Sequence, residues 1–147
     1  MTRIILVLLL LTTSCSPPTP VAYKSLDSDE LLGTQNSLLN QHNEEREANG
    51  KSAFIIDDDL NEFAQAHAET MARRNSLYHS SLGFSRKFST AGENIALGQR
   101  SEKEVVKGWM KSPGHKANIL NPRFTNIGFG IAYGPDQSIY WCTCFGG

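Results

Sequence analysis

Apolar residues recur at helical spacing in two long segments of the first half of the chain. The first segment begins at the N-cap candidates Asp27 and Ser28 and ends at Asn49–Gly50, a pair typical of a helix C-terminus. Its apolar stripe consists of Leu31, Leu32, Leu38, Leu39 and His42. Because His42 extends this stripe, it is interpreted as a core histidine.

A second helix is predicted over residues 57–77, where three aspartates precede an alanine-rich stripe. These carboxylates lie at the positive end of the helix dipole. The inward positions are Leu60, Phe63, Ala64, His67, Ala68 and Met71. The alanines indicate that another element packs closely here, and His67 is also interpreted as a core histidine.

Two shorter helices are predicted over residues 101–112 and 113–120. The first begins with a capping box of Ser101 and Glu104 and places Trp109 on its apolar face, where we expect it to be buried. The second begins with a proline, which is favoured in the first turn of a helix.

The spacing of apolar residues changes near the end of the chain from a helical period to a period of two. Residues 126–134 alternate large apolar side chains with glycine or alanine, which predicts a strand whose small face lets a helix or a ligand approach closely. Residues 138–146 return as a strand that is apolar on both faces and therefore central. The order of these elements, with the helices first and a β-hairpin last, predicts an α+β fold in which helices lie on both sides of an antiparallel sheet.

The first residues have the pattern of a secretory signal. A basic Arg3 precedes an apolar run that is too short to span a bilayer, and small residues follow up to Cys15. A cysteine at this place, before a Pro/Ser-rich stretch, resembles a bacterial lipoprotein signal. We expect residues 1–14 to be the signal peptide, Cys15 to carry a lipid that anchors the protein to the membrane, residues 15–27 to be a linker and residues 28–147 to form the domain. The alternative is an ordinary signal peptide and a freely secreted protein. Both interpretations place the domain in the cell envelope or outside the cell.

Composition narrows the classes of partner. A chain of 147 residues with a formal net charge of −1 fits one domain with a short appendage. This near-neutral balance provides no electrostatic footprint for nucleic acid. We therefore expect no nucleic-acid partner. A monomer is also expected.

Besides Cys15, the chain has two cysteines, Cys142 and Cys144. In an extended strand their side chains share one face, and their Cα atoms lie about 6.5–7 Å apart, at the outer limit of disulfide geometry. We interpret them as buried thiols that fill space beside a helix. A metal-binding pair is the alternative, although a C-x-C spacing alone is weak evidence for one.

Seven segments, in order, resemble the CAP superfamily, which comprises cysteine-rich secretory proteins, antigen 5 and plant pathogenesis-related proteins. The segments are HNEEREANG, LNEFAQAHAETMA, LYHSS, GENIALG, VVKGWMKSPGHKANIL, IGFGIAYG and YWCTCFG. The WMKSPGHKANIL block resembles the bacterial SCP-like branch. The resemblance covers about residues 35–146 and implies an α-β-α sandwich with a surface groove.

In animal and plant members of this superfamily, the groove holds two histidines and two glutamates that are able to bind a divalent metal. The resemblance assigns the first histidine to His79, in LYHSS, and the first glutamate to Glu93, in GENIALG. The second glutamate and the second histidine correspond to Ser112 and Tyr140, so half of the tetrad is replaced.

His115 is a candidate for a replacement ligand because it is the only other histidine outside the helix stripes. His79, Glu93 and His115 would suit a weak, open zinc site, with Ser112 and Tyr140 at the groove edge. The favoured alternative is that His79, Glu93 and His115 form a hydrogen-bonded polar cluster, which ties the polar, Gly/Ser-rich stretch of residues 78–98 to the helices. Glu93 would need such partners, since an unpaired buried carboxylate is costly.

Three classes of function compete. The resemblance favours a non-catalytic binding or effector module that holds a small apolar ligand, a lipid or a partner protein in its groove. A metal-assisted hydrolase would use His79 and Glu93. The sequence shows no nucleophile, base and orienting residue at a spacing that identifies a catalytic triad, and the adjacency of Ser80 to His79 is no evidence for one. The third class is an adhesive or scaffolding envelope lipoprotein. The fold alone does not choose among these classes.

Overall fold

The structure is a computed structural model that describes residues 23–147. The predicted signal peptide, Cys15 and most of the predicted linker therefore lie outside the described residues. Within residues 23–147, the structure has no helix of the length and apolarity that crossing a membrane requires.

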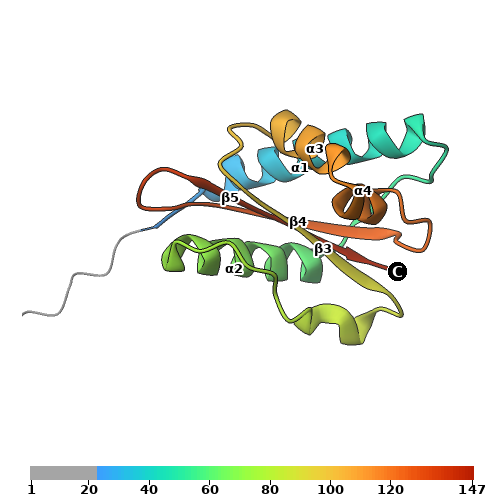
Figure 1. Ribbon diagram of the computed structural model, residues 1–147. Coiled ribbons are helices and arrows are strands. Elements are labelled where there is room, and N and C mark those ends of the chain that lie inside the picture. Colours follow the sequence, from blue (N-terminus) through green and yellow to red (C-terminus); the bar gives the residue numbers. More distant parts are fainter. Residues whose placement is uncertain (1–22) are drawn as a thin grey trace, which may run out of the picture.

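One five-stranded sheet separates two layers of helices (Figure 1). The helices are α1 (Ser28–Ala48), α2 (Asp58–Arg74), α3 (Glu102–Lys111) and α4 (Pro113–Ile119), with a 3₁₀ helix, η1 (Gly83–Lys87), after α2. The strands are β1 (Lys24–Ser25), β2 (Ile55–Ile56), β3 (Ala91–Leu97), β4 (Asn126–Tyr133) and β5 (Ile139–Gly146). Helix α2 covers one face, and α1, α3 and α4 cover the other (Figure 1). The predicted α+β, α-β-α sandwich is confirmed.

The sheet runs in the order β1-β4-β5-β3, and β2 pairs in parallel with β4. The predicted hairpin is confirmed, because β4 and β5 pair antiparallel from Ile127 opposite Phe145 to Tyr133 opposite Ile139. Strand β5 lies between β4 and β3, as its two apolar faces predicted. Trp109 of α3 is buried beneath the sheet with 2% of its surface exposed.

The small face of β4 explains how closely α2 approaches. A Cβ atom at Gly128 would lie 2.2 Å from the Leu60 carbonyl carbon, and one at Gly130 would lie 2.2 Å from the Ala64 carbonyl oxygen. The backbone of α2 therefore rests directly on these two glycines. The close packing that the alanines of α2 predicted is with the sheet.

The inward face of α1 differs from the predicted stripe. Leu32 is 56% exposed, whereas the polar residues Gln35 and Arg46 are buried beside Leu38 and His42. Arg46 is accommodated because its guanidinium donates to four backbone carbonyls, those of Ser52, Ile119, Asn121 and Phe124. A hydropathy pattern does not predict that an arginine is buried, since most of the carbonyls that accept from Arg46 belong to distant segments.

Strand β3 is an element that the sequence pattern missed. Residues 91–97 pair with β5 along their whole length, with Glu93 opposite Cys144. Its polar side chains are buried: Asn94 is 0% exposed, and its amide donates to the His115 carbonyl while accepting from Asn118. Tertiary partners thus allow a polar stretch to form a buried strand.

Candidate functional site

The loop that follows α2 brings His79 to Glu93. Glu93 Oε1 lies 2.8 Å from His79 Nδ1 and accepts a second hydrogen bond from the Ser80 backbone N–H at 2.9 Å. Only 2% of the Glu93 side chain is exposed, compared with 61% of the His79 side chain. The carboxylate accepts from Nδ1, so this nitrogen carries the proton in the contact and Nε2 is the free nitrogen of the ring.

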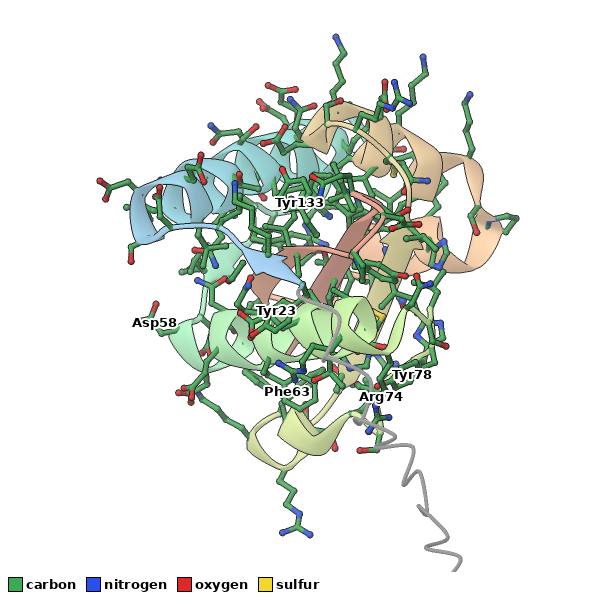
Figure 2. The ribbon with its side chains drawn as sticks, turned by 90° about the vertical axis from the view of Figure 1, so that its left-hand side faces the viewer. Tyr23, Asp58, Phe63, Arg74, Tyr78 and Tyr133 are labelled. Carbon is green, nitrogen blue, oxygen red and sulfur yellow. The ribbon has the colours of Figure 1, made fainter. Side chains whose placement is uncertain are left out.

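Tyr78 holds this loop against the C-terminal half of α2. Its carbonyl oxygen lies 2.8 Å from His67 Nε2, and its hydroxyl accepts from Arg74 at 3.1 Å. Figure 2 shows Tyr78 and Arg74 together at that end of α2. Because a carbonyl can only accept, His67 Nε2 carries a proton and donates it to Tyr78.

The second carboxylate oxygen of Glu93 faces the interior. Glu93 Oε2 lies 3.8 Å from Cys142 Sγ and 4.0 Å from His67 Nε2. Glu93 therefore links the loop, helix α2 and strand β5. The polar cluster expected from the sequence shares His79 and Glu93 with this arrangement, whereas its third member, His115, is not among the partners of Glu93.

The two cysteines of β5 converge beside this carboxylate. Cys142 and Cys144 are free, buried thiols whose sulfurs lie 3.9 Å apart. Burial, reinforced by the neighbouring Cys144 and Glu93, raises the pKa of the Cys142 thiol well above its ordinary value. In the part of the chain that the structure describes, Glu93, Cys142 and Cys144 form the only group of three potential ligand atoms that all lie within 4.8 Å of one another. This buried group could bind a metal ion.

His115, the expected third ligand, is not part of that close group. It lies on α4, half-buried, and its pKa is lowered by burial and by the nearby His79. Over residues 23–147 no hydrogen bond or ion pair joins its ring to Glu93. Of the three expected metal ligands, the structure brings only His79 and Glu93 into contact.

The two expected groove-edge residues have different positions. Ser112 lies half-buried between α3 and α4, where its backbone N–H donates to Trp109 and its carbonyl accepts from Lys116. Tyr140 is fully buried under α2 and donates its hydroxyl proton to Asn75 Oδ1 at 2.8 Å. The groove-edge prediction for Tyr140 is wrong because β5 is a central strand and α2 covers this face.

A cavity lies along the free edge of β3, next to the loop that carries His79. Its volume is about 290 Å³. Its lining residues are mostly apolar: Leu77, Ile95, Ala96, Leu97, Val105, Gly108 and Trp109, with Gln99 and His115 as the polar members. Trp109 Nε1 donates to the outward-facing carbonyl of Ile95, so α3 fixes the strand edge and forms one wall. We call this cavity the β3–α3 groove.

Comparison with known proteins agrees with this fold. The model of the cysteine-rich secretory protein family (CAP) matches residues 39–145. The Bacillus subtilis protein YkwD is 36% identical over 129 residues, which cover 81% of this chain and 46% of YkwD. The chain spans less than half the length of the curated relatives it matches.

Solved structures share the architecture at lower identity. An outer surface protein from Borrelia burgdorferi superposes with a TM-score of 0.73 at 22% identity, over 85% of this chain and 98% of that protein. An extracellular SCP-domain protein from Bacillus anthracis gives a TM-score of 0.68 at 24% identity, over 84% of this chain and 44% of that protein. Both likenesses concern the fold. The family match over residues 39–145 shows that this chain belongs to the cysteine-rich secretory protein (CAP) family.

Proposed function

We propose that this CAP-domain protein is a non-catalytic binding module of the cell envelope, which holds a small apolar ligand such as a lipid in the β3–α3 groove. The observation that carries the proposal is the groove itself: an open, mainly apolar cavity with His115 and Gln99 as polar members. Small-molecule sites commonly combine apolar walls with a few polar groups that orient the ligand.

The surroundings of the groove support the same function. The Trp109 ring is both a groove wall and a core residue, and its indole N–H is already bonded to Ile95, so the wall is preformed. Preformed walls favour binding because little conformational entropy is lost when the ligand enters. The names of two similar structures, an outer surface protein and an extracellular protein, support a location in the envelope or outside the cell.

The hydrolase alternative has less support. A metal-assisted mechanism would activate a water on a metal held by His79 and Glu93, and in the structure His79 Nδ1 and Glu93 Oε1 are bonded directly to each other, 2.8 Å apart. A mechanism with a protein nucleophile would need His79 to activate Ser80, and the hydroxyl oxygen of Ser80 accepts from the Leu82 N–H at 3.1 Å. The Cys142 thiol is fully buried with a raised pKa, which disfavours the reactive thiolate. A weak zinc site at His79, Glu93 and His115 stays a prediction.

Two exposed helical glycines provide a matched test. Gly108 lines the groove, whereas Gly33 lies on α1, and an added Cβ meets nothing within 4 Å at either position. Gly108→Leu should fill the groove without disturbing the fold, and Gly33→Leu should leave the groove open. Binding of a fluorescent fatty acid, followed by energy transfer from tryptophan, should weaken about tenfold or more in Gly108→Leu alone. Equal binding by both variants, or no saturable binding by the wild type, would contradict the proposal.

A further inference from the structure

The geometry points to a second site, separate from the groove: a buried centre for a thiophilic divalent cation, formed by Cys142 Sγ, Cys144 Sγ and Glu93 Oε2. This centre is distinct from the His79–Glu93–His115 set expected from the sequence, because two of its three ligands come from β5. It lies on the α2 side of the sheet and does not depend on the proposed lipid binding.

The spacing of the three atoms fits a metal. The two sulfurs are 3.9 Å apart, Cys142 Sγ is 3.8 Å from Glu93 Oε2, and the remaining separation is within 4.8 Å. A point equidistant from three atoms so spaced lies about 2.2–2.5 Å from each, close to the zinc–sulfur bond length of about 2.3 Å.

The backbone explains why the ligands converge. Cys142 and Cys144 alternate with Thr143, so both project toward α2, and Glu93 lies directly opposite Cys144 in the β3–β5 register. The facing stripe of α2 is built from small residues, with Ala64 and Ala68 in the same cluster as the two cysteines. Small neighbours leave the sulfurs free to face one another.

The contacts of His67 and His79 determine how many protein ligands the centre has. His67 Nε2 carries a proton that it donates to Tyr78, so it has no lone pair for a metal. His79 Nδ1 is bonded to the other carboxylate oxygen, Oε1, and orients Glu93 from outside, as outer partners of metal ligands commonly do. The proposed centre therefore has three protein ligands.

The chemistry of the site selects the cation. Both thiols give up their protons to solvent when the metal binds, and the product holds two thiolates and one carboxylate around one divalent ion. Two of the three ligand atoms are sulfurs, so the centre favours a cation that bonds strongly to sulfur. Zinc, cobalt(II) and cadmium meet this condition, whereas magnesium and calcium prefer oxygen ligands.

Cobalt(II) provides the direct test, because cobalt–thiolate bonds give charge-transfer absorption that oxygen and nitrogen ligands do not. The full chain, reduced and handled without oxygen, should bind one cobalt ion with this absorption, and zinc should displace it. Cys142→Ser and Cys144→Ser should each lower the affinity more than about tenfold. Thr143→Val, in the same strand but facing the opposite layer, is the matched control and should bind as the wild type does.

Two further measurements keep the test decisive. Cys15→Ser should retain the absorption, because the thiolates of the proposed centre are those of Cys142 and Cys144. Zinc should raise the melting temperature of the wild type and of Thr143→Val but not that of a folded Cys144→Ser variant. Absence of thiolate absorption, its persistence in Cys144→Ser, or its loss in Cys15→Ser would overturn the inference.

Discussion

His42 shows, at the scale of one residue, how the core of this domain constrains an ionisable group. Its ring is fully buried among Trp109, Phe129 and Phe145. Nδ1 lies 2.7 Å from the Leu38 carbonyl oxygen and therefore donates to it, while Nε2 has no hydrogen-bond partner in the described residues. Burial lowers the pKa of His42 to about 4, so the ring is neutral in the folded protein near neutral pH.

This pKa predicts a pH dependence of stability. The unfolded chain takes up a proton on His42 below about pH 6.5, whereas the folded chain resists it until about pH 4, so the free energy of unfolding should fall as the pH is lowered between these values. The loss assigned to His42 is about 3 kcal/mol. Urea denaturation of wild type and His42→Phe at pH 7 and pH 4.5 measures it. The two proteins should differ in their pH slope, and identical slopes would contradict the prediction.

Trp109 is the second residue whose contribution can be predicted. It is 2% exposed, bonds to the Ile95 carbonyl and is a wall of the β3–α3 groove. Trp109→Ala should lower the free energy of unfolding by about 3–5 kcal/mol, because it empties a large aromatic site. Trp109→Phe, which keeps most of the apolar volume, is the control and should cost less. A loss below about 1 kcal/mol in the alanine variant would show that neighbouring side chains refill the space.

At the scale of elements, the contact between α2 and β4 organises the α2 layer. Gly128 and Gly130 provide the room for the backbone of α2, and Leu60 and Ala64 occupy it. The same helix carries His67, which fixes the loop before His79 through the Tyr78 carbonyl. The position of α2 therefore determines both the packing of the sheet and the geometry at Glu93.

Gly130→Ala tests this contact. The new Cβ would lie 2.2 Å from the Ala64 carbonyl oxygen, so α2 must move or the sheet must bend. We expect a destabilisation of about 1–3 kcal/mol or more, the range for overpacking a core. Gly33→Ala is the control, because a Cβ there meets nothing within 4 Å and should stabilise α1 by about 0.5–1 kcal/mol. Equal thermal stability of the two variants would show that the helix–sheet distance adjusts freely.

At the scale of the whole molecule, the open prediction concerns the cellular location of the domain and its attachment to the membrane. The similar structures are named an outer surface protein and an extracellular protein. The sequence before residue 23 predicts a lipid on Cys15, and this residue lies outside the part that the structure describes.

Cell fractionation tests the predicted anchor. Cys15→Ala should move the protein from the membrane fraction to the soluble or secreted fraction, because the expected lipid would be lost. Cys144→Ser, which removes a buried thiol and leaves Cys15 in place, should stay in the membrane fraction. An unchanged distribution of Cys15→Ala would favour an ordinary signal peptide.

The sequence by itself determined the elements whose signals are local. Asp27 caps α1 and Ser101 caps α3, as side chains near a helix end can do without tertiary help. The second helix was predicted to run to residue 77, and in the structure Asn75 ends it earlier with a left-handed backbone. The β4–β5 hairpin was equally readable, because alternation between large and small residues has a period of two. The resemblance to the family supplied His79 and Glu93, which the structure brings within 2.8 Å.

Only the tertiary structure decided where polar residues are buried and which of them meet. No strand was predicted over residues 91–97, because the partners of Glu93 and Asn94, His79 and Asn118, lie elsewhere in the chain. Tyr140 was expected at a surface and is buried, since burial depends on the helix that covers the strand. The convergence of Glu93 with the two cysteines follows from the pairing of β3 with β5. A hydropathy pattern describes a residue's own preference, whereas strand register and helix coverage depend on contacts between distant segments.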